Sequence, residues 1–121
     1  MITAVASQLR TTDPAATIHF YTGTLGFTVD FVYEKFYADI RIGNHAIHLK
    51  RVDAADPSIA HVEEGGHLHL YFQTTGVAIF AEQLKRKGMA IVRDVHDTPW
   101  GTRELVVLDD QGHTRYFGEA L

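Results

Sequence analysis

The chain has no cysteine among its 121 residues. Its absence excludes disulfide bridges, thiolate metal sites and cysteine nucleophiles. Any chemistry must therefore use oxygen groups and imidazole rings, and the chain has 8 histidines.

Long apolar runs and an excess of basic charge are also missing. No stretch approaches the roughly 20 apolar residues that a membrane helix requires, and the N-terminus lacks the features of a signal peptide. The chain has 11 Lys and Arg against 15 Asp and Glu, a net charge of −4. Nucleic-acid binding needs a clustered basic surface. We therefore expect a cytoplasmic protein that binds neither membranes nor nucleic acid.

What is present is one order of elements, written twice. In the first half, a strand-like run over residues 2–10 precedes a helix that Asp13 and Pro14 begin and Gly26 ends. Three strands are predicted after it, over residues 28–34, 36–42 and 45–52. In the second half, Thr75 and Gly88 bound the predicted helix. The strands predicted around that helix cover residues 67–73, 89–96, 103–108 and 114–118.

This repeated order predicts an α+β fold of two βαβββ modules whose curled mixed sheets enclose a cavity. We expect a single domain over residues 1–121, with modules at 1–53 and 67–121 and a link at 54–66, which has little apolar periodicity. Modules this small leave open sheet edges, so a homodimer is also predicted.

Alternation along residues 67–73 predicts which side chains face the cavity. His67, His69 and Tyr71 share one face, whereas Leu68, Leu70 and Phe72 share the other. Because the apolar face should pack on the helix, we expect the histidines to point into the cavity.

Three motifs resemble a known family. Residues 13–27 are similar to the opening of the vicinal oxygen chelate superfamily, which includes glyoxalase I, extradiol dioxygenases, fosfomycin-resistance enzymes and bleomycin-binding proteins. Residues 99–104 and 109–113, PWGTRE and DDQGH, resemble the P-x-G-x-R-E and D-P-x-G-N/H motifs of its bleomycin-resistance-like branch, and residues 46–51 its fourth strand. Asp110 stands where the family usually has proline.

The resemblance implies a divalent metal held at four strand positions. In this chain those positions fall near Ala6 and on His48, His69 and Tyr116. Alanine cannot bind a metal, and neutral tyrosine is a poor ligand beside imidazole. Gln8 shares the face of Ala6 and is the alternative first ligand. Two interpretations therefore stay open: His48 and His69 are polar contacts in a metal-free pocket, or they bind Zn, Ni, Mn or Fe together with Gln8.

We interpret the chain as a metal-free protein that binds a small molecule, without a catalytic residue, and sequesters an antibiotic or an aromatic metabolite. The acidic excess favours a cationic ligand. The alternative is a metal-dependent lyase, isomerase or dioxygenase. The predicted ligand contacts are Phe31, Tyr33, Phe36, His48, His67, His69, Tyr71, Trp100 and Tyr116.

Three further assignments concern residues near the expected cavity. Trp100 is either a packing cap or a binding platform. Glu104 is either a base near the cavity or, as we favour, a structural partner for Arg103 or a neighbouring strand. The remaining histidines are expected to be exposed on helix, turn or loop positions; these are His19, His45, His61, His96 and His113.

Overall fold

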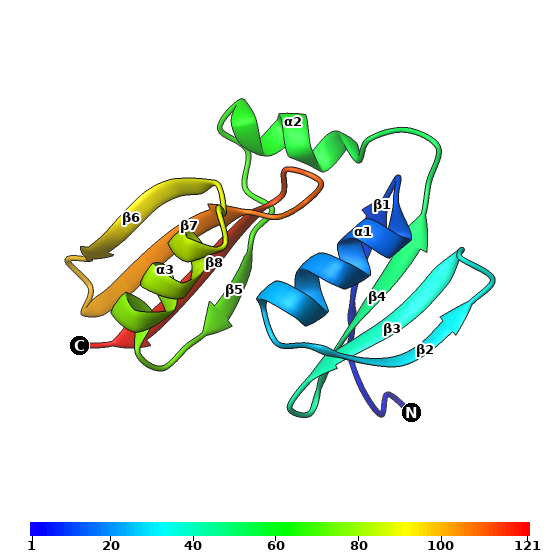
Figure 1. Cartoon of the computed structure of the whole chain (residues 1–121), viewed down its shortest axis with the longest axis horizontal. Coiled ribbons are helices and arrows are strands. Elements are labelled where there is room, and N and C mark those ends of the chain that lie inside the picture. The colour runs from blue at the N-terminus through cyan, green and yellow to red at the C-terminus, as the bar shows by residue number, and fades with distance from the viewer. The chain divides into compact units, whose positions relative to one another are not determined.

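The computed structural model describes residues 1–121 and divides the chain into two compact units, Met1–Asp56 and Pro57–Leu121. In each unit a helix packs on one face of a four-stranded sheet (Figure 1). The first unit contains, in order, β1 (Ser7–Thr11), α1 (Pro14–His19), η1 (Phe20–Thr24), β2 (Thr28–Tyr33), β3 (Tyr37–Ile42) and β4 (His45–Arg51). The second contains α2 (Pro57–Glu63), β5 (Leu70–Gln73), α3 (Val77–Arg86), β6 (Ile91–Asp97), β7 (Thr102–Leu108) and β8 (Thr114–Ala120).

The two sheets have the same topology. The strand order is β1-β4-β3-β2 in the first and β5-β8-β7-β6 in the second. In each, the first and last strands of the unit pair in parallel and the other pairs are antiparallel. The predicted α+β class with two βαβββ modules is confirmed. The shared cavity, the single domain and the homodimer stay predictions.

In the first unit, a side chain caps the start of the helix. Asp13 accepts a hydrogen bond from the Ala16 amide at 3.1 Å and caps α1, as the sequence predicts. The helix ends in a π-helical turn, η1, before Gly26 at φ 84°.

Strand alternation in the first unit separates an apolar face of the sheet from a polar one. Ile40 and Leu49 are fully buried in the apolar core. The neighbouring residues Asp39 and His48 point to the opposite face of the sheet.

In the second unit, the core forms between α3 and one face of the sheet. Val77, Ala81 and Leu84 of α3 are buried. The ring of Phe117 lies 5.1 Å from those of both Phe72 and Phe80. Phe72 thus packs toward the helix, as predicted, although Leu68 on the same face remains exposed.

A carboxylate from the last strand caps α3. Glu119 on β8 accepts hydrogen bonds from the amides of Gly76 at 2.8 Å and Val77 at 3.2 Å. The N-cap residue is Gly76, with φ 65°, and not Thr75 as the sequence predicts. The predicted cap was wrong because a side chain far along the chain supplies the acceptor that Thr75 would have offered.

Several predicted boundaries also differ from the structure, among them that of the strand predicted over residues 67–73, which begins at Leu70. Strand β1 begins at Ser7, and the six residues before it are exposed. The predicted link contains the helix α2, which has no buried residue. The sequence did not predict this helix, because residues 54–66 have little apolar periodicity. No helix of the structure has both the length and the apolarity to cross a membrane.

Candidate functional site

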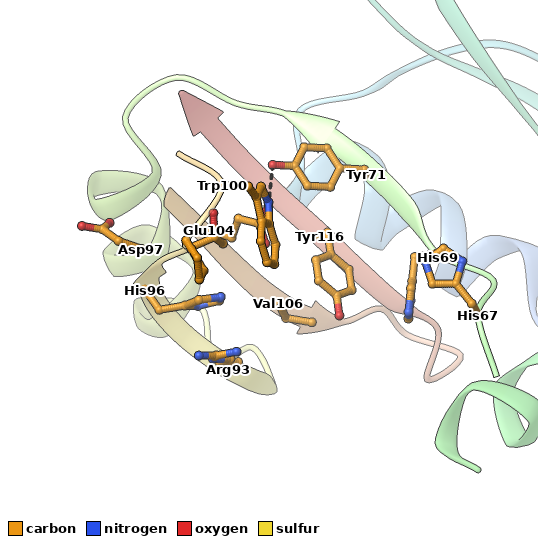
Figure 2. A pocket seen from close by; sticks show the side chains of 12 residues that line it. His67, His69, Tyr71, Arg93, His96, Asp97, Trp100, Glu104, Val106 and Tyr116 are labelled. Carbon is orange, nitrogen blue, oxygen red and sulfur yellow. Dashed lines mark hydrogen bonds between the residues drawn. The ribbon is translucent and has the colours of Figure 1, made fainter. Parts of the chain in front are cut away.

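A pocket of about 640 Å³ lies on the face of the second sheet that α3 does not cover (Figure 2). All four strands of this sheet and the loop between β6 and β7 contribute to it. Its lining residues are His67, His69, Tyr71, Arg93, His96, Asp97, Thr98, Pro99, Trp100, Glu104, Val106 and Tyr116.

Aromatic rings form a continuous wall along β5 and β8. The ring of His69 lies 4.7 Å from His67 on one side and 4.7 Å from Tyr116 on the other. Tyr71 stacks on Tyr116 with ring centroids 6.4 Å apart and an angle of 21° between the planes. The predicted alternation over residues 67–73 brings His67 and His69, which precede β5, and Tyr71 of β5 to one face. The parallel pairing of Tyr71 with Tyr116 adds the fourth ring.

Trp100 extends the aromatic surface of the pocket from the loop between β6 and β7. Its side chain is 72% exposed, so it is not a packing cap. The loop itself is well held, because Thr98 bonds Thr102 through the backbone at 2.8 Å and through the two hydroxyls at 2.8 Å. Hydrogen bonds therefore hold the loop in place while the indole of Trp100 is exposed.

A buried acid lies at the same pocket. Glu104 on β7 is only 5% exposed, and its Oε2 accepts hydrogen bonds from the hydroxyls of Tyr71 at 2.9 Å and Thr102 at 3.0 Å. The Tyr71 hydroxyl reaches it by crossing β8 at Gly118, where a Cβ atom would overlap that hydroxyl. Glu104 is thus a structural partner for Tyr71 on β5, beyond β8, and the prediction that it pairs with Arg103 or with an adjacent strand was wrong.

Strand β6 carries two register irregularities, between Ile91 and Arg93 and between Arg93 and His96. As a result, Arg93 opposes Val106 and His96 opposes Glu104, both on the pocket face. The prediction that His96 and His113 are exposed was wrong, because His96 is half-buried on β6 and His113 is buried. Bulges of this kind re-aim side chains next to functional sites.

Three pKa values in the pocket are shifted, and the hydrogen bond from Arg103 lowers that of Asp97. Burial, reinforced by the charges of His67 and Arg115, lowers the pKa of His69 below its usual value, which favours the neutral ring. Burial of the hydroxyl and its hydrogen bond to Glu104 raise the pKa of Tyr71. The Tyr71 ring is half exposed, but its hydroxyl end is held at the buried acid.

Four of the predicted ligand contacts belong to the first unit and do not line this pocket. Phe31, Tyr33 and Phe36 are exposed there. The imidazole of His48 belongs to a polar network: its Nδ1 lies 3.1 Å from the Tyr37 hydroxyl and its Nε2 lies 3.4 Å from Asp39 Oδ2.

In the first unit, His48 and Gln8, two of the candidate metal ligands, already have side-chain partners. Both ring nitrogens of His48 have protein partners, and the Gln8 amide donates to the Tyr37 hydroxyl at 3.1 Å. Nowhere do three or more His, Cys, Asp or Glu side chains form a group that could hold a metal ion.

Comparison with known proteins identifies the family. The model of the glyoxalase/bleomycin resistance protein/dioxygenase superfamily matches residues 2–115. The chain belongs to this superfamily. No curated protein has a significantly similar sequence.

Several solved structures share the fold at low sequence identity. TioX from Micromonospora sp. ML1 is 23% identical, with a TM-score of 0.76 and coverage of 98% of this chain and 99% of that one. Lactoylglutathione lyase from Agrobacterium tumefaciens is 18% identical, with a TM-score of 0.75 and coverage of 97% and 92%. The bleomycin-binding protein of Streptomyces verticillus, in complex with copper(II)-bleomycin, is 22% identical, with a TM-score of 0.69 and coverage of 97% and 95%. At these identities the likeness establishes the fold alone.

Proposed function

We propose that this superfamily member binds a flat, aromatic small molecule in the pocket of the second unit and sequesters it without changing it chemically. The observation that carries the proposal is the exposed indole of Trp100 beside the stacked rings of Tyr71 and Tyr116 in one pocket. Exposing a tryptophan to water is unfavourable, and planar ligands cover such rings by stacking.

The size and lining of the pocket support this proposal. Its volume of about 640 Å³ lies within the range of small-molecule sites. The aromatic wall offers apolar area, while His69, Tyr71 and Glu104 offer a few polar atoms that would orient a ligand. The predicted contacts from Phe31, Tyr33, Phe36 and His48 stay predictions, because these residues lie in the other unit.

Bleomycin-type antibiotics are the first ligands to try. The sequence motifs resemble the bleomycin-resistance-like branch, and one protein of similar fold is a bleomycin-binding protein. A protein that binds such a drug tightly would protect a cell by mass action, with no reaction needed.

The indole of Trp100, the only tryptophan, provides the test. Titration with a bleomycin-type compound should change its fluorescence and saturate near one ligand per chain. In calorimetry, Trp100→Ala should weaken binding by about 1 to 3 kcal/mol, because a stacked indole contributes on that scale.

The matched control is Ile79→Ala, which removes an exposed apolar side chain from α3, outside the pocket. It should leave the affinity unchanged. Absence of heat and of any fluorescence change with bleomycin-type compounds would reject these drugs as ligands. Equal losses of affinity in Trp100→Ala and Ile79→Ala would reject the pocket itself.

A further inference from the structure

Glu104 is the buried charge of the pocket, and no cation neutralises it. It is 5% exposed and takes part in no ion pair. The adjacent Arg103 is engaged elsewhere, because its Nε donates to Asp97 at 2.9 Å on the exposed side. A carboxylate shielded from water without a counter-ion is unfavourable, and a cation that reaches it gains more than it would in solvent.

The structure leaves one oxygen of this carboxylate available. Both hydroxyl donors, from Tyr71 and Thr102, bond Oε2, whereas Oε1 accepts no hydrogen bond from the protein. The two donors fix the orientation of the carboxylate, so they are positioning residues. The Tyr71 hydroxyl can reach Glu104 because Gly118 has no Cβ atom in its path.

A second charged group of the pocket favours the opposite kind of ligand. Arg93 lines the pocket and forms no ion pair, so it would attract an anion. Arg93 is exposed, however, and water and salt weaken its field. Glu104 is buried, and its field is weakened much less.

We propose that Glu104 recognises charge in this pocket, and that the ligand is an aromatic compound carrying a cationic N–H donor, such as an amidinium or protonated amine. The cationic group would bond Oε1 while the aromatic part stacks on the rings of Tyr116 and Trp100. This inference rests on the proposed function, and it adds the charge class of the ligand and the residue that selects it.

Three matched probes test the inference: 2-naphthamidine, 2-naphthamide and 2-naphthoate, which share one ring system and differ in charge. Affinities for the 121-residue chain are measured from Trp100 fluorescence and checked by calorimetry. The amidine should bind about tenfold or more tightly than the amide, because hydrogen bonds to a buried charge are strong. The naphthoate should bind most weakly.

The variant Glu104→Gln keeps an acceptor for Tyr71 and Thr102 but removes the charge. It should lower the affinity of the amidine to that of the amide and leave the amide unchanged, which also shows that the pocket is folded. Equal binding of amidine and amide to the wild-type protein, or tightest binding of the naphthoate, would overturn the role of Glu104 while the aromatic pocket stands. Failure of all three probes to bind would instead reject the proposed aromatic pocket, and the inference with it.

Discussion

At the scale of single residues, Gly118 matters because it has no side chain. Its place on β8 lies under the Tyr71 hydroxyl, and an added Cβ would occupy the same space. The hydrogen bond between Tyr71 and Glu104 therefore depends on this glycine.

We predict that Gly118→Ala moves Tyr71 away from Glu104 and lowers the pKa of Tyr71 toward its usual value of 10.0. The raised pKa comes from burial of the hydroxyl and from Glu104, and the displaced side chain loses both. Tyrosinate absorbance is followed against pH, and the same variant with Tyr71→Phe identifies the contribution of Tyr71. An unchanged titration of Tyr71 would show that the ring tolerates the added methyl group in place.

His69 is a second residue with a measurable effect, because its shifted pKa makes the stability of the fold depend on pH. Its folded-state pKa lies below the ordinary 6.5, so the unfolded chain takes up this proton at a higher pH than the folded chain does. The contribution to stability is therefore fully present above pH 6.5 and is lost as the pH falls toward the folded pKa.

We predict that His69→Gln makes the free energy of unfolding fall less steeply below pH 6.5 than it does in the wild-type protein. Urea unfolding at a series of pH values measures this slope. His61→Gln is the control, since His61 lies on α2 outside the pocket. Identical slopes for His69→Gln and the wild-type protein would contradict the lowered pKa.

At the scale of elements, the end of one strand secures the start of a helix. Glu119 of β8 bonds two amides at the N-terminus of α3, where a carboxylate also favours the helix dipole.

We predict that Glu119→Ala lowers the free energy of unfolding by about 1 kcal/mol, the usual cost of losing a helix cap. The control Glu82→Ala removes an exposed carboxylate from α3 that bonds only Lys85, and it should change stability much less. Chemical denaturation of both variants measures the difference. Equal stability of the two variants would show that Glu119 is not an effective cap.

The elements also show which features the sequence could predict. Alternation over residues 69–72 correctly separates His69 and Tyr71 from Phe72, because an extended chain has a period of two. Arg93 and His96 are three residues apart, so regular alternation would place them on opposite faces. The irregular register of β6 brings both to the pocket, and local sequence does not specify such bulges. The cap from Glu119 is likewise a long-range contact that local patterns do not contain.

At the scale of the whole molecule, the repeated order of elements predicted the two βαβββ modules, and the three motifs predicted the family. The motif at residues 99–104 covers the loop before β7 and the start of that strand, and its residues Trp100 and Glu104 line the pocket. Motifs could not predict that Glu104 is buried without a cation, because that depends on how β5, β7 and β8 pair.

We predict a homodimer in solution. The edge strand β2 of the first sheet carries the exposed apolar side chains Phe31, Val32 and Tyr33, a surface that association would cover. Sedimentation equilibrium at micromolar concentration measures the mass. A mass of one chain, 13.5 kDa, across the concentration range would reject the dimer.

The central claim is that the ligand binds on the open face of the second sheet. Its most direct test is NMR mapping, in which assigned side-chain and amide signals are followed as 2-naphthamidine is added. We expect the largest shifts at the Trp100 indole and at Tyr71 and Tyr116, with saturation at one ligand per chain. Saturable binding that leaves these three residues unperturbed would contradict the account.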